Sequence, residues 1–306
     1  MYAKSFFYDR TSYVKECNVS FYDRKINGLD VVKVIDAMDC NKAPGIDGIR
    51  VRDLKLVKEH ISPVLAMLII NCISNGIYPD LLKTAIIRPI FKRGSHRDYT
   101  NYRPMAILST INKIFEKVVM KQIGEFLDKH SVLTSSQHGF RSNKNTATAL
   151  SEFSDDVNNA FNNRDMVVVL YIDFKKAFDT LEHECLLQAM EECGIRGPVN
   201  AWFRNYLENR KIVVRINGVD SNTGKIKYGV PTGSVFGPIG YTMHVNSLVN
   251  VVRNCRIYMY ADDICLDYSG RDGGQLQMKI QQDFNNVIKW SHDNGIIINL
   301  HIINIK

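Results

Sequence analysis

Apolar and polar residues follow helical spacing over several segments of the chain. In INKIFEKVVMKQIGEFLDKH (residues 111–130), apolar side chains recur every three or four positions, so this segment is expected to form an amphipathic helix. The same reasoning predicts helices in GLDVVKVIDAM (28–38) and TATALSEFSDDVNNAFNN (146–163). The first half of the chain is therefore predicted to be mostly helical.

The longest uninterrupted apolar run is VLAMLIINCI (64–73). It is half as long as the roughly 20 residues that a membrane-spanning helix needs, so we expect a buried helix. Ser62 would cap this helix, Pro63 would lie in its first turn, and Gly76 and Pro79 would follow its end. Charged residues interrupt the apolar N-terminus, which argues against a secretory signal. We therefore expect a soluble intracellular protein, nuclear or cytoplasmic and not secreted, with no membrane partner.

Strand patterns dominate the second half. VVVLYI (167–172) is short, continuous and rich in valine, which is typical of a buried strand. A helix is expected to begin near Asp179 and to end at Gly194, with Asp179 and Glu182 in capping-box spacing. KTAIIRPIFKRG (83–94) is predicted to form a strand that leads into a basic turn. RKIVVRING (210–218) is predicted to form an exposed strand.

RIYMY and ICLDYS (256–260 and 264–269) read as the two arms of a hairpin, with Ala261, Asp262 and Asp263 between them. An antiparallel sheet backed by helices, following a mostly helical basic half, is an α+β arrangement. This is the fold class that the patterns predict.

Composition narrows the class of protein. Hydrophobic residues make up 45% of the chain and charged residues 23%, which is typical of a globular protein and argues against extended disorder. The net charge of +7 suits a polyanionic partner, although a solvated basic surface would give the same value. Seven cysteines without a close CxxC pair support neither a disulfide framework nor a zinc site.

Three carboxylates stand at predicted strand ends: Asp173 after the buried strand, and Asp262 and Asp263 in the hairpin. Each site alone is typical of a cap or a turn. If the three meet, their repulsion needs a cation, and hard oxygen ligands select Mg²⁺. Two Mg²⁺ ions about 3.5–4 Å apart are a common device for nucleotidyl transfer. Sequence spacing leaves open whether the three carboxylates meet in space.

Six motifs in order carry a family resemblance. YIDFKKAFD, GVPTGSVFGP and YADD (171–179, 229–238 and 260–263) resemble the palm motifs of reverse transcriptases. Upstream, NKAPGIDGI, RPIFKRGSHRDYTNYRPMAILS and QHGFRSNKNTATAL resemble the fingers of the LINE-type (non-LTR retrotransposon), jockey-like group. The resemblance runs from about residue 41 to about residue 300.

The resemblance implies a right-hand polymerase with an antiparallel palm sheet backed by helices. Its expected parts are an N-terminal extension (1–40), fingers (41–164) and a palm (165–306), with the thumb absent. The implied activity is RNA-directed DNA polymerase, a nucleotidyltransferase. The implied partners are an RNA template, a DNA primer and dNTPs; no protein partner is inferable.

Metal binding is implied for Asp173, Asp262 and Asp263, with two Mg²⁺ ions, or Mn²⁺, as cofactor. The backbone carbonyl of Ile172 or, as the family pattern favours, of Phe174 would add a ligand. Phe178 matches an aromatic steric gate that would exclude a 2′-hydroxyl; the alternative is a core phenylalanine.

Further contacts are implied in the fingers and in the loop before the hairpin. Lys92 and Arg103 match basic residues that grip the triphosphate, although either alone is typical of a surface cation. Gly233 and Ser234 match a loop that approaches the nucleotide and template, where glycine could equally shape a turn. The residues that resemble the template-facing part of the fingers are Gln137, Gly139, Phe140 and Arg141.

The sequence also departs from the family pattern. Thr232 stands where the family nearly always has Gln, and Ile302 stands where a lysine is often proposed to protonate the leaving pyrophosphate. Lys306 is close enough in sequence to be considered as a substitute, although it is the last residue of the sequence. Three interpretations stay open: an active polymerase domain, a truncated or decayed copy that binds nucleic acid with little synthesis, and a host interaction protein recruited from such a copy.

Overall fold

The structure is a computed structural model that describes residues 17–22, 25–299 and 304–305. Contacts divide the chain into two compact units. The carboxylate unit, named for the three aspartates in it, comprises Met1–Asn18, Leu127–Cys193 and Gly240–Lys306. The hairpin unit comprises Val19–Phe126 and Gly194–Ile239. These units are defined by packing, so the functional division into fingers and palm at residue 164 stays a prediction.

The carboxylate unit is built on a four-stranded antiparallel sheet. Its order is β7 (Arg256–Tyr260), β8 (Asp263–Gly270), β3 (Met166–Asp173) and β9 (Asn304–Ile305). The predicted buried strand and the predicted hairpin are therefore confirmed. Because side chains alternate between the faces of a sheet, Asp173 and its register partner Asp263 share one face, and Ile172 and Ile264 share the other.

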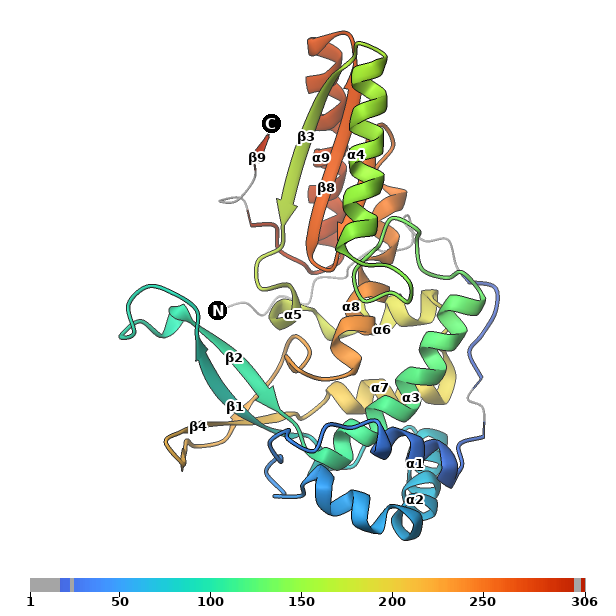
Figure 1. Cartoon of the computed structure of the whole chain (residues 1–306), viewed down its shortest axis with the longest axis vertical. Coiled ribbons are helices and arrows are strands. Elements are labelled where there is room, and N and C mark those ends of the chain that lie inside the picture. The colour runs from blue at the N-terminus through green and yellow to red at the C-terminus, as the bar shows by residue number, and fades with distance from the viewer. Residues whose placement is uncertain (1–16, 23–24, 300–303, 306) are drawn as a thin grey trace. The chain divides into compact units, whose positions relative to one another are not determined.

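Two helices cover this sheet, as Figure 1 shows: α4 (Thr146–Asn162) and α9 (Gly273–Asp293). Trp290 of α9 packs on Phe174. Because Phe174 is two residues after Ile172, its side chain lies on the same face of the sheet as Ile172. Phe153 of α4 packs edge-on against Tyr258, on the face of the aspartates. The helix α4 therefore covers one end of the carboxylate face.

The chain after β3 forms α5 (Ala177–Thr180) and α6 (His183–Glu192), and the segment after α8 forms η4 (Asn246–Asn250). The helix expected to start near Asp179 is thus broken in two. Its capping box is wrong, because Glu182 is itself the N-cap of α6 and accepts a hydrogen bond from the amide of Cys185. The predicted end near Gly194 is confirmed, since α6 stops at Glu192.

The hairpin unit holds a mixed sheet of order β2-β1-β4-β5, with β6 also paired to β4. Strands β1 and β2 are antiparallel, whereas β1 and β4 are parallel. The predicted strands at 83–94 and 210–218 are confirmed as β1 and β4. The strand bounds are β1 (Thr84–Phe91), β2 (Tyr102–Ile107), β4 (Lys211–Ile216), β5 (Val219–Asp220) and β6 (Gly224–Lys225).

Helices pack around an aromatic cluster in the hairpin unit, where Tyr78, Trp202 and Tyr206 have ring centroids within 6.4 Å of one another. The expected helices at 28–38 and 111–130 are confirmed as α1 and α3, and α4 confirms the one at 146–163. The helices and short turns are α1 (Gly28–Asp36), α2 (Val51–Ser74), η2 (Asp80–Leu82), η3 (Tyr99–Asn101), α7 (Gly197–Leu207), and α3 (Thr110–Lys129) and α8 (Phe236–His244), which each continue into the carboxylate unit.

The predicted start of α2 is wrong. The helix begins at Val51, and Pro63 lies inside it, so Ser62 is not its cap. Packing of α2 against α1 overrides the proline, and the N-terminal Gly28 of α1 lies directly on the Pro63 ring. By length and composition, α2 is the one helix in the described part of the chain that could cross a membrane, which is weak evidence because core helices share these properties. The expected lack of a membrane partner stays a prediction.

Candidate catalytic site

The sheet register brings two of the three aspartates together. Asp173, the last residue of β3, pairs directly with Asp263, the first residue of β8. Asp262 precedes Asp263 in the turn between β7 and β8, and Ala261 before it has the left-handed φ of 56°. Opposed residues in a sheet have Cβ atoms about 4.5–5.5 Å apart, so the Asp173 and Asp263 side chains are neighbours.

These carboxylates repel one another. The surrounding atoms partly desolvate Asp263 and raise its pKa, and Asp262 and Asp173 raise it further. Burial also raises the pKa of Tyr241, which again feels Asp262, Asp173 and Asp263. None of the three carboxylates forms an ion pair with a residue that the structure describes. The site therefore carries uncompensated negative charge.

Asn299 holds one of these carboxylates in place. Its side-chain amide donates to Oδ2 of Asp173 at 2.9 Å, and its backbone N–H donates to the Asp173 carbonyl at 2.8 Å. The backbone of Lys175 donates to Ile297 of the same segment. Residues 297–299 thus close the end of β3 and fix the orientation of Asp173.

The residue types fit a hard divalent cation, since three carboxylates supply oxygen ligands and lack a compensating charge. Across residues 17–22, 25–299 and 304–305, however, no three His, Cys, Asp or Glu side chains stand in a ready-made metal-holding group. The three carboxylates therefore lie near one another, but their side chains are not arranged as a complete set of metal ligands. Phe174 is buried and bridges to Ile298, and the role of its carbonyl stays a prediction.

Phe178 lies between two aromatic rings. Its ring centroid is 4.9 Å from that of Tyr241 and 6.2 Å from that of Phe140. The side chain is half-buried, so these contacts fix the ring while leaving part of it accessible. This arrangement suits either a gate for the sugar or a packing residue.

Gln137 and Gly139 lie against Ala261 in the turn between β7 and β8, a contact that the sequence did not predict. Gln137 is only 1% exposed, and its amide bonds the backbone of Ala261 and of Gly139. A Cβ on Gly139 would lie 2.2 Å from the Ala261 nitrogen. The Gln137 side chain is buried against the hairpin turn, and its expected template contact stays a prediction. Phe140 is 49% exposed and keeps a free face.

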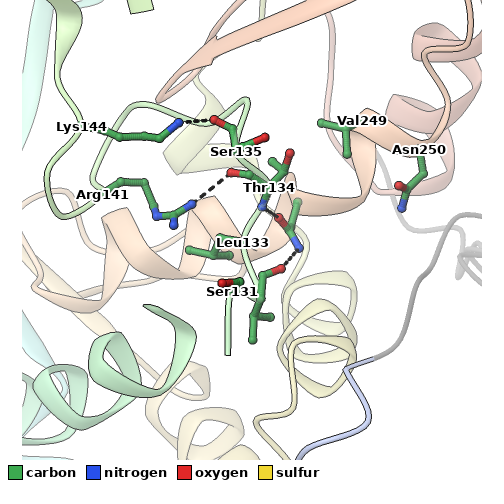
Figure 2. A pocket seen from close by; sticks show the side chains of 10 residues that line it. Ser131, Leu133, Thr134, Ser135, Arg141, Lys144, Val249 and Asn250 are labelled. Carbon is green, nitrogen blue, oxygen red and sulfur yellow. Dashed lines mark hydrogen bonds between the residues drawn. The ribbon is translucent and has the colours of Figure 1, made fainter. Parts of the chain in front are cut away.

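Arg141 lines a pocket of about 470 Å³ within the carboxylate unit, shown in Figure 2. One guanidinium N–H donates to the Thr134 carbonyl at 3.0 Å, and Nη2 lies 3.6 Å from Asp128. Lys144 donates to the neighbouring carbonyl of Ser135. Both cations therefore serve first to hold the loop at residues 131–135.

Lys92 and Arg103 lie on the two arms of the β1–β2 hairpin in the hairpin unit. The Lys92 N–H donates to the Asn101 carbonyl at 2.9 Å, and Arg103 pairs with Ile90. This register places Lys92 and Arg103 diagonally on one face of the hairpin. Both side chains are exposed, and neither forms an ion pair in the described part of the chain. They remain available to an anion.

The loop at residues 230–235 is held by buried hydrogen bonds. Gly233 is exposed with a φ of 104°, and a Cβ there would lie 3.0 Å from the Ala106 carbonyl. The Thr232 carbonyl accepts from the Ala106 N–H at 3.0 Å. Ser234 is 5% exposed, and its hydroxyl accepts from the Gly237 N–H at 2.9 Å. The Ser234 side chain therefore caps α8, and its expected contact with substrate stays a prediction.

Sequence reasoning missed Glu116, whose side chain is 1% exposed on α3. Its carboxylate accepts from the Val235 N–H at 2.5 Å, from the Tyr206 hydroxyl at 2.8 Å and from the Asn112 amide at 2.6 Å. A glutamate among the apolar positions of a predicted helix was the available signal. Ile302 and Lys306 lie outside the described residues.

Comparisons with known proteins show what the chain is similar to. Residues 90–303 match the family model of the reverse transcriptase (RNA-dependent DNA polymerase). The chain is 27% identical over 274 residues to a Drosophila melanogaster protein described as "Probable RNA-directed DNA polymerase from transposon BS", a match that covers 85% of the chain. It is 28% identical to the corresponding X-element protein and 26% identical to that of mobile element jockey, both from D. melanogaster and both over 88% of the chain. The chain spans 30% of the length of each of these relatives.

Proposed function

The chain belongs to the reverse transcriptase family, in which it is related to the RNA-directed DNA polymerases of non-LTR retrotransposons, and from this we propose that it is the fingers and palm of such an enzyme. The reaction would add dNTPs to a primer 3′ end, copied from an RNA template. The proposal includes an intracellular location, in the nucleus or the cytoplasm.

One observation carries the proposal within the carboxylate unit. Asp173 and Asp263 are register partners at the end of a sheet, Asp262 adjoins them, and no described cation neutralises the three. Such an arrangement costs stability unless a ligand supplies positive charge. A site that stores repulsion in this way is suited to bind divalent metal and polyphosphate.

The chain's own residues would divide the work of nucleotidyl transfer. Asp173, Asp262 and Asp263 would hold two Mg²⁺ or Mn²⁺ ions, and Asn299 keeps the Asp173 carboxylate oriented toward them. When bound, such ions lower the pKa of an attacking hydroxyl and stabilise negative charge on phosphate.

Substrate recognition would fall to residues that are exposed or half-buried. Lys92 and Arg103 would bind the triphosphate, Arg103 through the paired N–H groups of its guanidinium. The ring of Phe178, braced by Tyr241, would exclude a 2′-hydroxyl and so select deoxynucleotides. Gly233 would let the backbone approach the nucleotide closely.

A second candidate function is nucleic-acid binding with little synthesis, as in a decayed copy. Thr232 and Ile302 favour it, because threonine is shorter than the glutamine of the family pattern and isoleucine cannot donate a proton. General-acid assistance is typically worth about 10²- to 10⁴-fold in rate, so such a loss would leave binding intact and synthesis slow.

The deciding experiment measures dNTP incorporation on a primed RNA template with Mg²⁺, beside an Asp262→Asn control. Incorporation above that control supports the polymerase. Incorporation equal to the control, together with retained binding of primed RNA in fluorescence anisotropy, would favour the second candidate. Loss of both would contradict both functions.

A further inference from the structure

Gln137 hydrogen-bonds the turn that carries Asp262 and Asp263. Its Oε1 accepts from the Ala261 N–H at 3.0 Å, and its Nε2 lies 3.4 Å from the Ala261 carbonyl. One buried amide thus bonds both backbone groups of the residue that precedes the paired aspartates.

Ala261 needs such support because its backbone is left-handed. Its φ of 56° is a conformation that residues with a Cβ adopt at a cost, and glycine would adopt it freely. Turning Ala261 into a more extended conformation would rotate the following peptide and redirect Asp262. The hydrogen bonds from Gln137 oppose that relaxation.

The segment around Gln137 is fixed to β7 as well as to the turn. The His138 N–H donates to the Met259 carbonyl at 2.8 Å, and the Met259 N–H donates to the Ser136 carbonyl at 2.9 Å, which forms a short parallel bridge. Gly139 lets this segment lie against Ala261, since any side chain there would collide with the Ala261 nitrogen.

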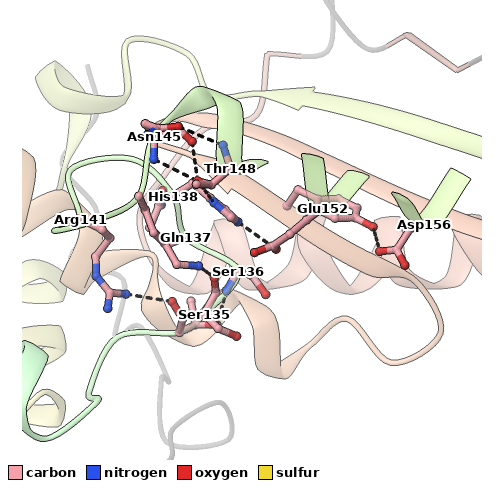
Figure 3. Close-up of polar contacts among 12 residues, drawn as sticks. Ser135, Ser136, Gln137, His138, Arg141, Asn145, Thr148, Glu152 and Asp156 are labelled. Carbon is pink, nitrogen blue, oxygen red and sulfur yellow. Dashed lines mark hydrogen bonds and ion pairs between the residues drawn. The ribbon is translucent and has the colours of Figure 1, made fainter. Parts of the chain in front are cut away.

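The helix α4 holds the other side of this segment, as Figure 3 shows. His138 is fully buried, with Nδ1 2.9 Å from the Thr148 hydroxyl and Nε2 3.2 Å from the Glu152 carboxylate. A continuous set of contacts therefore runs from α4 through His138 and Gln137 to the turn.

We propose that Gln137 is a positioning residue for nucleotidyl transfer: its amide clamps Ala261 in the left-handed conformation that aims Asp262 and Asp263 at the divalent cation. The inference rests on the proposed function, since it names how that site is held. It gives Gln137 a role inside the protein, while the expected template contact of this residue stays a separate prediction.

The test compares Gln137→Met, which keeps the length of the side chain and removes its hydrogen bonds, with Gln122→Met as a matched control. Gln122 is another buried glutamine, 7% exposed and located in the hairpin unit. For Gln137→Met we expect incorporation to fall by about 10- to 100-fold, the usual effect of removing a partner that orients a metal ligand. The Mg²⁺ concentration for half-maximal rate should rise while KM for dNTP stays within about twofold, because the triphosphate contacts are elsewhere.

Titration with Mn²⁺, followed by electron paramagnetic resonance, gives a readout that needs no turnover. Gln137→Met should bind the Asp262-dependent Mn²⁺ about 10- to 100-fold more weakly than wild type or Gln122→Met. If the wild-type chain fails to incorporate dNTPs, the proposed function fails, and the Mn²⁺ titration still decides the role of Gln137. If folded Gln137→Met binds Mn²⁺ with wild-type affinity, the proposed positioning role of Gln137 is wrong.

Hydrogen exchange of residues 257–263 tests the clamp without metal or activity. The Ala261 amide should lose protection in Gln137→Met, and unchanged protection would contradict the proposal.

Adding Ala261→Gly to Gln137→Met should recover part of the lost metal affinity, because glycine reaches the left-handed conformation unaided. If Gln137→Met does not fold, Gly139→Ala applies the same exchange test by pushing the segment away from Ala261. Unaltered exchange there would count equally against the clamp.

Discussion

Two groups of carboxylates lie on the same face of one sheet and are stabilised in opposite ways. At one end of β8, Asp263 faces Asp173 and adjoins Asp262, without a cation among the described residues. Four residues along the same strand, Asp267 is fully buried under α4 and bound to Arg256. Residues at even spacing along a strand share a face, so Asp263 and Asp267 point to the same side of the sheet. The two aspartates differ in the groups that surround them.

At the buried site, Arg256 forms ion pairs with two aspartates. Arg256 donates to Asp267 through Nη2 at 2.8 Å and through Nε at 3.2 Å, and its Nη1 lies 2.6 Å from Asp156 of α4. Burial raises the pKa of Asp267, and the hydrogen bonds and charge of Arg256 act in the opposite direction. At Asp263, desolvation, Asp262 and Asp173 all raise the pKa. At Asp267 a cation of the chain compensates the buried charge, whereas no ion pair among the described residues does so at Asp263.

The largest expected effect is the loss of activity in Asp173→Asn. Removing one metal-binding carboxylate should cost about 4 kcal/mol of transition-state stabilisation, a loss of roughly a thousandfold in dNTP incorporation. Thermal stability without metal should stay equal or rise, because the change relieves like-charge repulsion. A large drop in melting temperature would show that Asp173 is a structural group like Asp267.

The next effect is on stability, at Arg256. Arg256→Met leaves Asp267 buried without its cation, so the free energy of unfolding in urea should fall by about 3–5 kcal/mol. Arg271→Met is the matched control, since Arg271 is 78% exposed and its contact with Asp165 is 3.4 Å long. The control should change stability by less than about 1 kcal/mol. Equal effects of the two variants would contradict the contrast between paired and exposed charges.

Asp283 is a third kind of carboxylate, whose charge is stabilised by hydrogen bonds from backbone amides and not by a cation. The backbone N–H groups of Arg253, Asn254 and Cys255 donate to it, and, despite the opposing effect of burial, these hydrogen bonds lower its pKa. A lowered pKa means that Asp283 stabilises the fold above its unfolded pKa of about 3.9 and that this stability is lost as pH falls through the folded pKa.

In urea unfolding at pH 7, Asp283→Asn should lose about 1–3 kcal/mol, because at least one buried N–H loses its acceptor. The loss relative to wild type should begin to shrink below about pH 3.9, where the unfolded chain takes up the proton, and should continue to shrink until the pH reaches the lower folded pKa. A loss that is independent of pH would mean that packing, and not charge, makes Asp283 important.

The smallest effect concerns His138, a buried group that can acquire a charge. Burial lowers its pKa, Lys144 lowers it further, and Glu152 acts in the opposite direction. The unfolded state therefore binds more protons below the unfolded pKa of about 6.5, so stability should decrease on acidification by at most about 1.4 kcal/mol per pH unit. Urea unfolding between pH 7.5 and 5.5 measures this slope, and His138→Asn should flatten it. An unchanged slope in that variant would assign the dependence to other groups.

Most strands and helices were predictable because local periodicity reports burial. The valine run before Asp173 and the hairpin around Asp262 needed no tertiary information. The start of α2 was not predictable, because packing against α1 overrides the proline at position 63. The cap at Asp179 failed for a similar reason: α6 takes the next carboxylate, Glu182, as its N-cap.

The sequence by itself determined the family, the residue types of the candidate metal site and the strands that carry them, since motif order and apolar periodicity are local properties of the chain. Only the tertiary structure decided how those residues are supported. The β3–β8 register places Asp173 opposite Asp263, Gln137 bonds Ala261 from 124 residues away, and Glu116 holds the loop at Val235. Hydrogen bonds between distant segments depend on how the backbone folds, and no spacing along the chain encodes which buried amide or carboxylate will meet which turn.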